Sequence, residues 1–124
     1  MIKYEVIKMM DKAKMKEAHI DYEVGVKRFA GKEALYEKYL LKFLDDTHFQ
    51  QASDAMEKED YEEILKAVHA LKGVSGTLAI QDLYEDCSRV VADIREDRIE
   101  EVASHFKTLS EDYNRAVSFI EEMK

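Results

Sequence analysis

Apolar residues recur every three or four positions along most of the chain, the spacing that places side chains on one face of an α-helix. No stretch shows the apolar–polar alternation of a half-buried strand, and the polar connections between the periodic segments are short. We therefore predict an all-α protein, an up-and-down antiparallel four-helix bundle with additional N-terminal helices. The predicted helices cover residues 2–18, 21–29, 33–46, 47–58, 60–78, 80–96 and 98–121.

More helices are predicted than a four-helix core can hold. We assign the core to residues 33–46, 60–78, 80–96 and 98–121, and expect the other helices to pack across an end or side of the bundle. The role of residues 47–58 is the least determined. This segment could join the core as a separate helix or continue into the helix that follows it.

Several helix ends carry recognisable capping residues. Asp21 and Asp60 are predicted N-caps, and Thr47 with Gln50 has the form of a capping box. Gly31 fits the left-handed position that often follows a helix. In the first helix we expect one apolar side, made of Ile2, Val6, Met9, Met10 and Ala13.

Composition narrows the classes of partner. The 124 residues suit one compact domain, 1–124, and the net charge of -8 argues against nucleic acid, because phosphate binding needs a basic surface. No run approaches the roughly 20 apolar residues that span a bilayer, and the N-terminus lacks a signal-like apolar segment. The single cysteine, Cys87, favours a reducing compartment and falls in the predicted core. We expect a cytoplasmic protein that does not bind membranes.

The helix predicted at 60–78 carries the candidate chemistry. His69 projects away from the apolar stripe, and Lys72, Gly73 and Gly76 follow it at positions i+3, i+4 and i+7, on the same face. Each mid-helix glycine costs about 1 kcal/mol relative to alanine. Close approach of another surface is the most direct reason to tolerate two of them. This face is therefore predicted to be a docking patch with an exposed nucleophile and an exposed lysine.

An exposed histidine beside a lysine can bind metal, act as a base or carry a phosphoryl group. Metal binding needs convergent ligands, yet His19, His48 and His105 fall on different predicted helices. Catalysis on a small substrate needs a pocket, which the glycines do not furnish. A carrier role fits better, because a neutral imidazole nitrogen can attack an activated phosphoryl group while Lys72 offsets the charge on its oxygens.

The motif His69-Ala70-Leu71-Lys72-Gly73, followed by Leu78, Leu83 and Cys87, resembles the histidine-containing phosphotransfer (HPt) domain. The segment Gly25 to Lys32, with Leu35-Tyr36 and Leu40 to Phe43 after it, is similar to the first helices of the same family. The resemblance runs from about Ile20 to the C-terminus. It leaves residues 1–19 as an extra N-terminal helix before a family-like region at 20–124.

The resemblance implies a phosphocarrier, not an enzyme in its own right, that works in a two-component phosphorelay. His69 would be the phosphoacceptor, Lys72 its supporting cation and Gly73 the clearance residue, with Gly76 and Lys66 on the same docking face. The implied partners are response-regulator receiver domains and a hybrid sensor histidine kinase. The receiver would supply Mg²⁺ and the aspartate, so we expect no intrinsic cofactor or metal, and a monomer suits a carrier that presents one face.

Two residues depart from the family pattern. Ala79 stands where a glycine is usual, and it would cost about 1–2 kcal/mol if that turn needs a left-handed residue. Val91 stands where many members carry a Glu or Gln facing the histidine. These departures leave open an alternative, a non-transferring interaction module that binds receiver or kinase domains through the same helix face.

Overall fold

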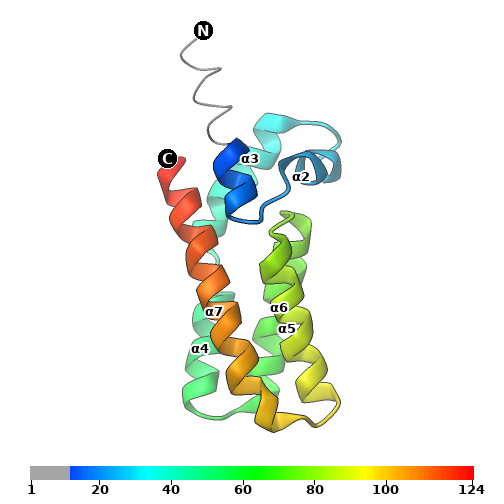
Figure 1. Cartoon of the computed structure of the whole chain (residues 1–124), viewed down its shortest axis with the longest axis vertical. Helices are drawn as coiled ribbons and strands as arrows, with labels where there is room; N and C mark the ends of the chain where they lie inside the picture. The colour runs from blue at the N-terminus through cyan, green and yellow to red at the C-terminus, as the bar shows by residue number, and fades with distance from the viewer. Residues whose placement is uncertain (1–11) are drawn as a thin grey trace, which may run out of the picture.

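The computed structural model describes residues 12–124, which form helices joined by short turns (Figure 1). This confirms the predicted all-α class. Residues 12–17 are helical. The further elements are α2 (Tyr22–Arg28), α3 (Glu33–Lys42), the 3-10 turn η1 (Phe43–Asp45), α4 (His48–Glu57), α5 (Tyr61–Thr77), α6 (Gln81–Arg95) and α7 (Ile99–Glu122). None of the helices within residues 12–124 is both long enough and apolar enough to cross a bilayer.

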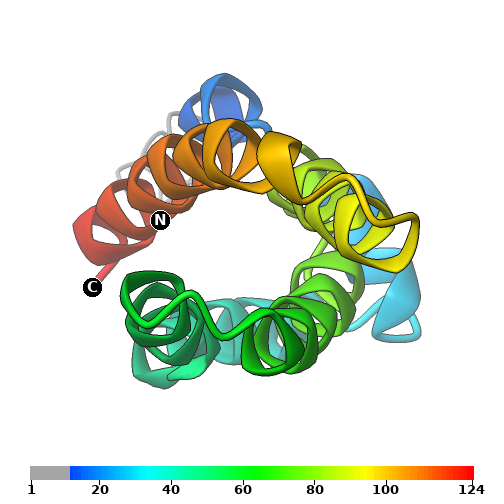
Figure 2. The same cartoon turned by 90° about the horizontal axis from the view of Figure 1, so that it is seen from below.

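Helices α4 to α7 run alternately down and up along the long axis of the molecule (Figure 1). Seen end-on they form a ring, in which α5 packs between α4 and α6, and α6 packs on α7 (Figure 2). Phe49 of α4 closes the ring by stacking on Tyr113 of α7, with ring centroids 4.0 Å apart. Each helix gives one apolar face to the shared core, which includes Ile64, Val68, Leu71, Leu83, Val90, Leu109 and Ile120.

The segment 33–46 is not one continuous core helix, which corrects the predicted choice of core segments. Its α-helix ends at Lys42, the turn η1 follows, and Asp46 is extended. At 1.5 Å per residue α3 spans only about 15 Å and α5 about 26 Å, so α3 covers one half of the bundle. The segment 47–58 supplies the other half. It belongs to the core as a separate helix, with Ala52 and Ala55 buried.

The N-terminal segments are tied to the end of the bundle where α5 turns into α6. Ile20 and Ile80 form an isolated antiparallel bridge, in which Asp21 N donates to Ala79 O at 2.9 Å and Gln81 N donates to His19 O at 3.0 Å. The buried Tyr36 hydroxyl donates to Leu78 O at 2.7 Å. These bonds fix α2 and α3 over the C-terminal end of α5.

Part of the predicted first helix can be compared with the structure. Met15 and Ala18 are buried, and Ala13, expected on the apolar side, is exposed. The helical face of residues 12–17 is therefore rotated from the predicted one. The predicted positions Ile2, Val6, Met9 and Met10 lie outside the described residues.

Two of the three predicted N-caps are confirmed. The carboxylate of Asp21 accepts from Val24 N at 3.1 Å, and that of Asp60 accepts from Glu63 N at 3.2 Å. The capping box at Thr47 is wrong, because its hydroxyl caps no backbone amide. The Asp46 carboxylate instead accepts from His48 N at 2.9 Å, which a side chain one residue further upstream can reach.

Ala79 adopts the left-handed conformation that its position was expected to need, with φ at +58°. Ile80 N donates to Ser75 O at 2.9 Å and Ala79 N donates to Gly76 O at 3.2 Å, the two bonds of a Schellman helix end. Glycine would make this turn without the strain of about 1–2 kcal/mol that an L-residue carries there. The left-handed turn therefore forms with alanine in place of glycine, and the methyl group of Ala79 is buried.

Candidate functional site

Helix α5 has two sharply different faces. Ile64, Val68, Leu71 and Ser75 are fully buried against the rest of the bundle. The Asp60 cap fixes where the helix starts, and the spacing of its apolar residues determines which side chains point outward. Along the opposite face Lys66, His69 and Gly73 are exposed, as their helical spacing predicts.

The imidazole of His69 stands clear of the protein. Its side chain is exposed, and no hydrogen bond or ion pair joins it to another residue in the described part of the chain. The imidazole ring is therefore open to a second molecule. An accessible, uncommitted nitrogen is what a histidine nucleophile requires.

A shallow depression of about 330 Å³ lies against His69, between α5 and the end of α6. Two cations line it, Lys66 of α5 and Arg95 from the last turn of α6, together with two carboxylates. Sequence reasoning missed Arg95. The available signal was its spacing, because Arg95 follows Val91 by four residues and so lies on the same face of α6. The depression is completed by Leu65, Glu62 and Glu63.

Lys72 lies differently from the exposed position predicted for it. The residue is half-buried, and its ammonium sits 5.6 Å from the ring centroid of Tyr84, on α6. An aromatic face attracts a cation, and α6 packs close enough for the lysine to lie across the ring. Lys72 is not among the residues lining the depression at His69.

The two glycines of this face have different surroundings. A Cβ atom on Gly73 would meet no atom within 4 Å, so nothing in the described fold requires a glycine there. A Cβ on Gly76 would lie 3.0 Å from the Tyr84 ring. Arg28 also donates to the Gly76 carbonyl oxygen. Gly76 therefore has a packing role within the chain. At Gly73, by contrast, only the approach of another protein surface explains the loss of helix stability that a glycine brings.

In a comparison with protein families, residues 39–118 match the model of the Hpt domain. The matched region contains η1, α4, α5 and α6 completely, and thus the whole of the His69 surface. The chain belongs to the Hpt domain family. No curated protein and no solved structure matches the chain.

Membership of the Hpt domain family implies histidine phosphotransfer in two-component signalling. Hpt domains are phosphocarriers that interact with receiver domains and histidine kinases. The match begins at Tyr39, so α2 and most of α3 precede it, although the resemblance seen in the sequence starts near Ile20.

Val91, which stands where many Hpt domains carry a Glu or Gln, gives His69 no polar partner. Its side chain is buried and apolar, so it cannot hold the imidazole in one tautomer by a hydrogen bond. Neighbouring Cys87 is also buried, as predicted, and burial raises the pKa of its thiol to about 12. Arg95 is the residue of α6 that lines the depression beside His69.

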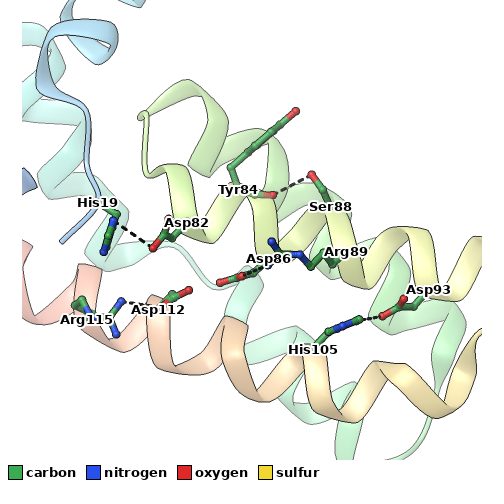
Figure 3. Close-up of polar contacts among 10 residues, drawn as sticks. All are labelled: His19, Asp82, Tyr84, Asp86, Ser88, Arg89, Asp93, His105, Asp112 and Arg115. Carbon is green, nitrogen blue, oxygen red and sulfur yellow. Dashed lines mark hydrogen bonds and ion pairs between the residues drawn. The ribbon is translucent and has the colours of Figure 1, made fainter. Parts of the chain in front are cut away.

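The other histidines are each held by an aspartate. His19 lies 3.4 Å from Asp82 and His105 lies 2.5 Å from the buried Asp93 (Figure 3). His48 lies 3.0 Å from Asp46. Between residues 12 and 124, no three His, Cys, Asp or Glu side chains are grouped so as to hold a metal ion. His69 alone among the four histidines has an imidazole without such a contact within this range.

Proposed function

We propose that this protein is a phosphorelay carrier in a two-component system. It accepts a phosphoryl group on His69 from a receiver-domain aspartate, or through a histidine kinase relay, and passes the group to another receiver. The observation that carries the proposal is the exposed, uncommitted imidazole of His69, with Lys66 and Arg95 on one side and Gly73 one turn away.

The transfer needs only one bond made and one broken. The lone pair of an imidazole nitrogen forms the N–P bond as the P–O bond to the receiver aspartate breaks, and the aspartate leaves as a carboxylate. The second ring nitrogen keeps or loses its proton to solvent, because no protein group holds it. The return step to a second receiver reverses these changes. The receivers supply the Mg²⁺ ion and the acid pocket that stabilise the transferring group.

The test is incubation of the purified protein with a receiver domain that carries a radiolabelled phosphoryl group. We expect label to move to this protein and to be stable in base and labile in acid, the behaviour of a phosphohistidine. Label should then move to a second, unlabelled receiver. Binding of the receiver without any transfer of label would favour the non-transferring interaction module instead.

The cations around His69 should contribute unequally to transfer. We expect Arg95→Ala to slow phosphoryl transfer about 10- to 100-fold, because a hydrogen bond to a charged group contributes about 1.5–3 kcal/mol. Lys72→Ala should slow transfer less, since the Lys72 ammonium lies over Tyr84 and must leave the ring to reach the phosphoryl oxygens. Rapid-quench transfer assays would measure both rates.

Lys107→Ala is the matched control for these charge changes, because Lys107 is an exposed cation on α7. Its transfer rate should equal that of the unmodified protein. Far-ultraviolet circular dichroism would verify that each variant keeps its helices. An Arg95→Ala variant that transfers at the normal rate would exclude Arg95 from the site.

Substitution of Gly73 should separate docking from folding. We expect Gly73→Phe to weaken receiver binding at least tenfold, because a large side chain would stand in the space next to His69 that the partner must enter. Stability should not fall, because a Cβ atom at Gly73 meets no atom within 4 Å and the residue is exposed. Titration calorimetry with a receiver and urea unfolding would measure the two effects. Normal binding by Gly73→Phe would place the docking surface elsewhere.

A further inference from the structure

The interface between α6 and α7 contains two buried aspartates, Asp86 and Asp93. The proposed role in phosphotransfer does not explain why they are there. They lie seven residues apart on α6 and therefore on the same face, toward α7. Asp86 is 3% exposed and Asp93 is 1% exposed. Ionised carboxylates at such positions must be paired, because the loss of hydration costs several kcal/mol.

Asp93 has the partners that a buried carboxylate requires. His105 Nδ1 lies 2.5 Å from Asp93 Oδ2, and Arg98 Nη2 lies 3.3 Å from Asp93 Oδ1. Each oxygen thus has a nitrogen donor, one of them a permanent cation. Both oxygens of the Asp93 carboxyl group are therefore paired within the interface.

Asp86 lacks such compensation. Its Oδ1 accepts from Arg89 Nη1 at 3.1 Å, but its Oδ2 is buried without a hydrogen-bond partner. Another acid, Asp112 of α7, lies opposite Asp86, and the two carboxyl groups point toward each other (Figure 3). Two ionised carboxylates repel each other. A pair of carboxyl groups can form a hydrogen bond only if one of them holds a proton.

We propose that Asp86 and Asp112 share one proton across the α6–α7 interface, and that loss of this proton weakens the packing of α7 on α6. The proton resides on the otherwise unpartnered Oδ2 of Asp86 and is donated to Asp112. Arg115 of α7 lies 2.7 Å from Asp112 Oδ1 and forms an ion pair with that partner. The fold thereby contains a pH-sensitive contact between α6 and α7.

The charges around Asp86 agree with this arrangement. Burial raises the pKa of Asp86 to about 8, and the neighbouring Asp112 carboxyl group adds to the rise. The charge of Arg89 lowers the pKa of Asp86, and the charge of Asp82 raises it. Asp82 also lies 3.4 Å from His19. On the α5 side, Lys72 acts on the thiol of Cys87 and is not among the groups that shift the pKa of Asp86.

Because the pKa of Asp86 is raised in the folded protein, the stability of the fold should fall as the pH rises. The folded protein holds the Asp86 proton up to about pH 8, and the unfolded chain releases it near 3.8. The stabilising contribution is therefore complete below about pH 4 and is lost as the pH rises to about 8. Over that range one linked proton changes the unfolding equilibrium constant about tenfold per pH unit.

The experiment combines a carboxyl ¹³C NMR titration of the unmodified protein with urea unfolding of Asp86→Asn at several pH values. We expect Asp86 to titrate near pH 8. Asp112→Asn, which removes the repelling charge, should lower this midpoint. Asp86→Asn keeps the donor to Asp112 without an ionisable proton, so its stability should depend less on pH and exceed that of the unmodified protein at pH 8.

Asp82, a less buried aspartate one turn before Asp86 on α6, supplies the matched control for the Asp86→Asn substitution. Asp82→Asn should retain most of the pH dependence of the unmodified protein, because Asp82 makes only a minor contribution to the Asp86 environment. A titration midpoint for Asp86 near 3.8 would overturn the proposal. So would an Asp86→Asn variant whose stability follows the same pH curve as that of the unmodified protein.

Discussion

The substitution His69→Gln should abolish phosphoryl acceptance. Glutamine occupies a similar volume and keeps helical propensity, but its amide nitrogen has no lone pair available for attack on phosphorus. Because His69 is exposed and forms no hydrogen bond or ion pair in the described range, we expect the variant to fold normally. The measurement is label transfer from a phosphorylated receiver, and we expect a loss of at least a thousandfold.

The remaining histidines provide the controls for this result. His19→Gln, His48→Gln and His105→Gln should each accept label, because those imidazoles are engaged with Asp82, Asp46 and Asp93. The His69→Gln variant should still bind the receiver, since the docking surface is intact. Binding without transfer in this variant alone separates loss of the nucleophile from loss of docking. Acceptance of label by His69→Gln would show that the phosphoacceptor lies elsewhere.

Replacing Gly25 by alanine should produce the largest loss of stability among the glycine substitutions. A Cβ atom on Gly25 would overlap the ring of Tyr36, which is completely buried and bound through its hydroxyl to Leu78 O. Overpacking costs about 1–3 kcal/mol and loss of a buried hydrogen bond about 1 kcal/mol more. We expect Gly25→Ala to lower the free energy of unfolding by about 3 kcal/mol, measured by urea denaturation.

Gly73→Ala is the matched change at an open position. It should raise the free energy of unfolding by about 1 kcal/mol, because alanine is the better helix former and its methyl group meets no other atom. Equal stability changes at Gly25 and Gly73 would contradict the packing described around Tyr36. A phosphotransfer rate that stays normal in a folded Gly25→Ala variant would show that the α2 attachment is not needed for the His69 surface.

The sequence contains enough information to predict the helices and the outward face of α5. The spacing of apolar residues from Ile64 to Ser75 determines which side of α5 is buried, and His69 must then face outward. The bundle order was harder to predict. Helix α4 lies in the core but buries the small residues Ala52 and Ala55, whereas 33–46 buries the larger Tyr36, Leu40 and Phe43.

The environment of the candidate site depends on contacts between helices, which spacing along one helix does not reveal. Lys72 and Gly76 share a face with His69, but only the position of α6 shows that Tyr84 interacts with both. Arg95 reaches the same surface from a helix that ends beside His69. The buried Asp86 was hidden for the same reason, because an isolated aspartate in an amphipathic pattern is normally solvated.

The most direct test of a phosphorelay role is to locate the phosphoryl group on the protein itself. The protein would be charged by a phosphorylated receiver, digested at neutral or basic pH and analysed by mass spectrometry with fragmentation that preserves the N–P bond. We predict a single phosphorylated peptide with the phosphoryl group on His69, which disappears when an unphosphorylated receiver is added. A phosphoryl group on another residue, or one on His69 that no receiver can remove, would contradict the account.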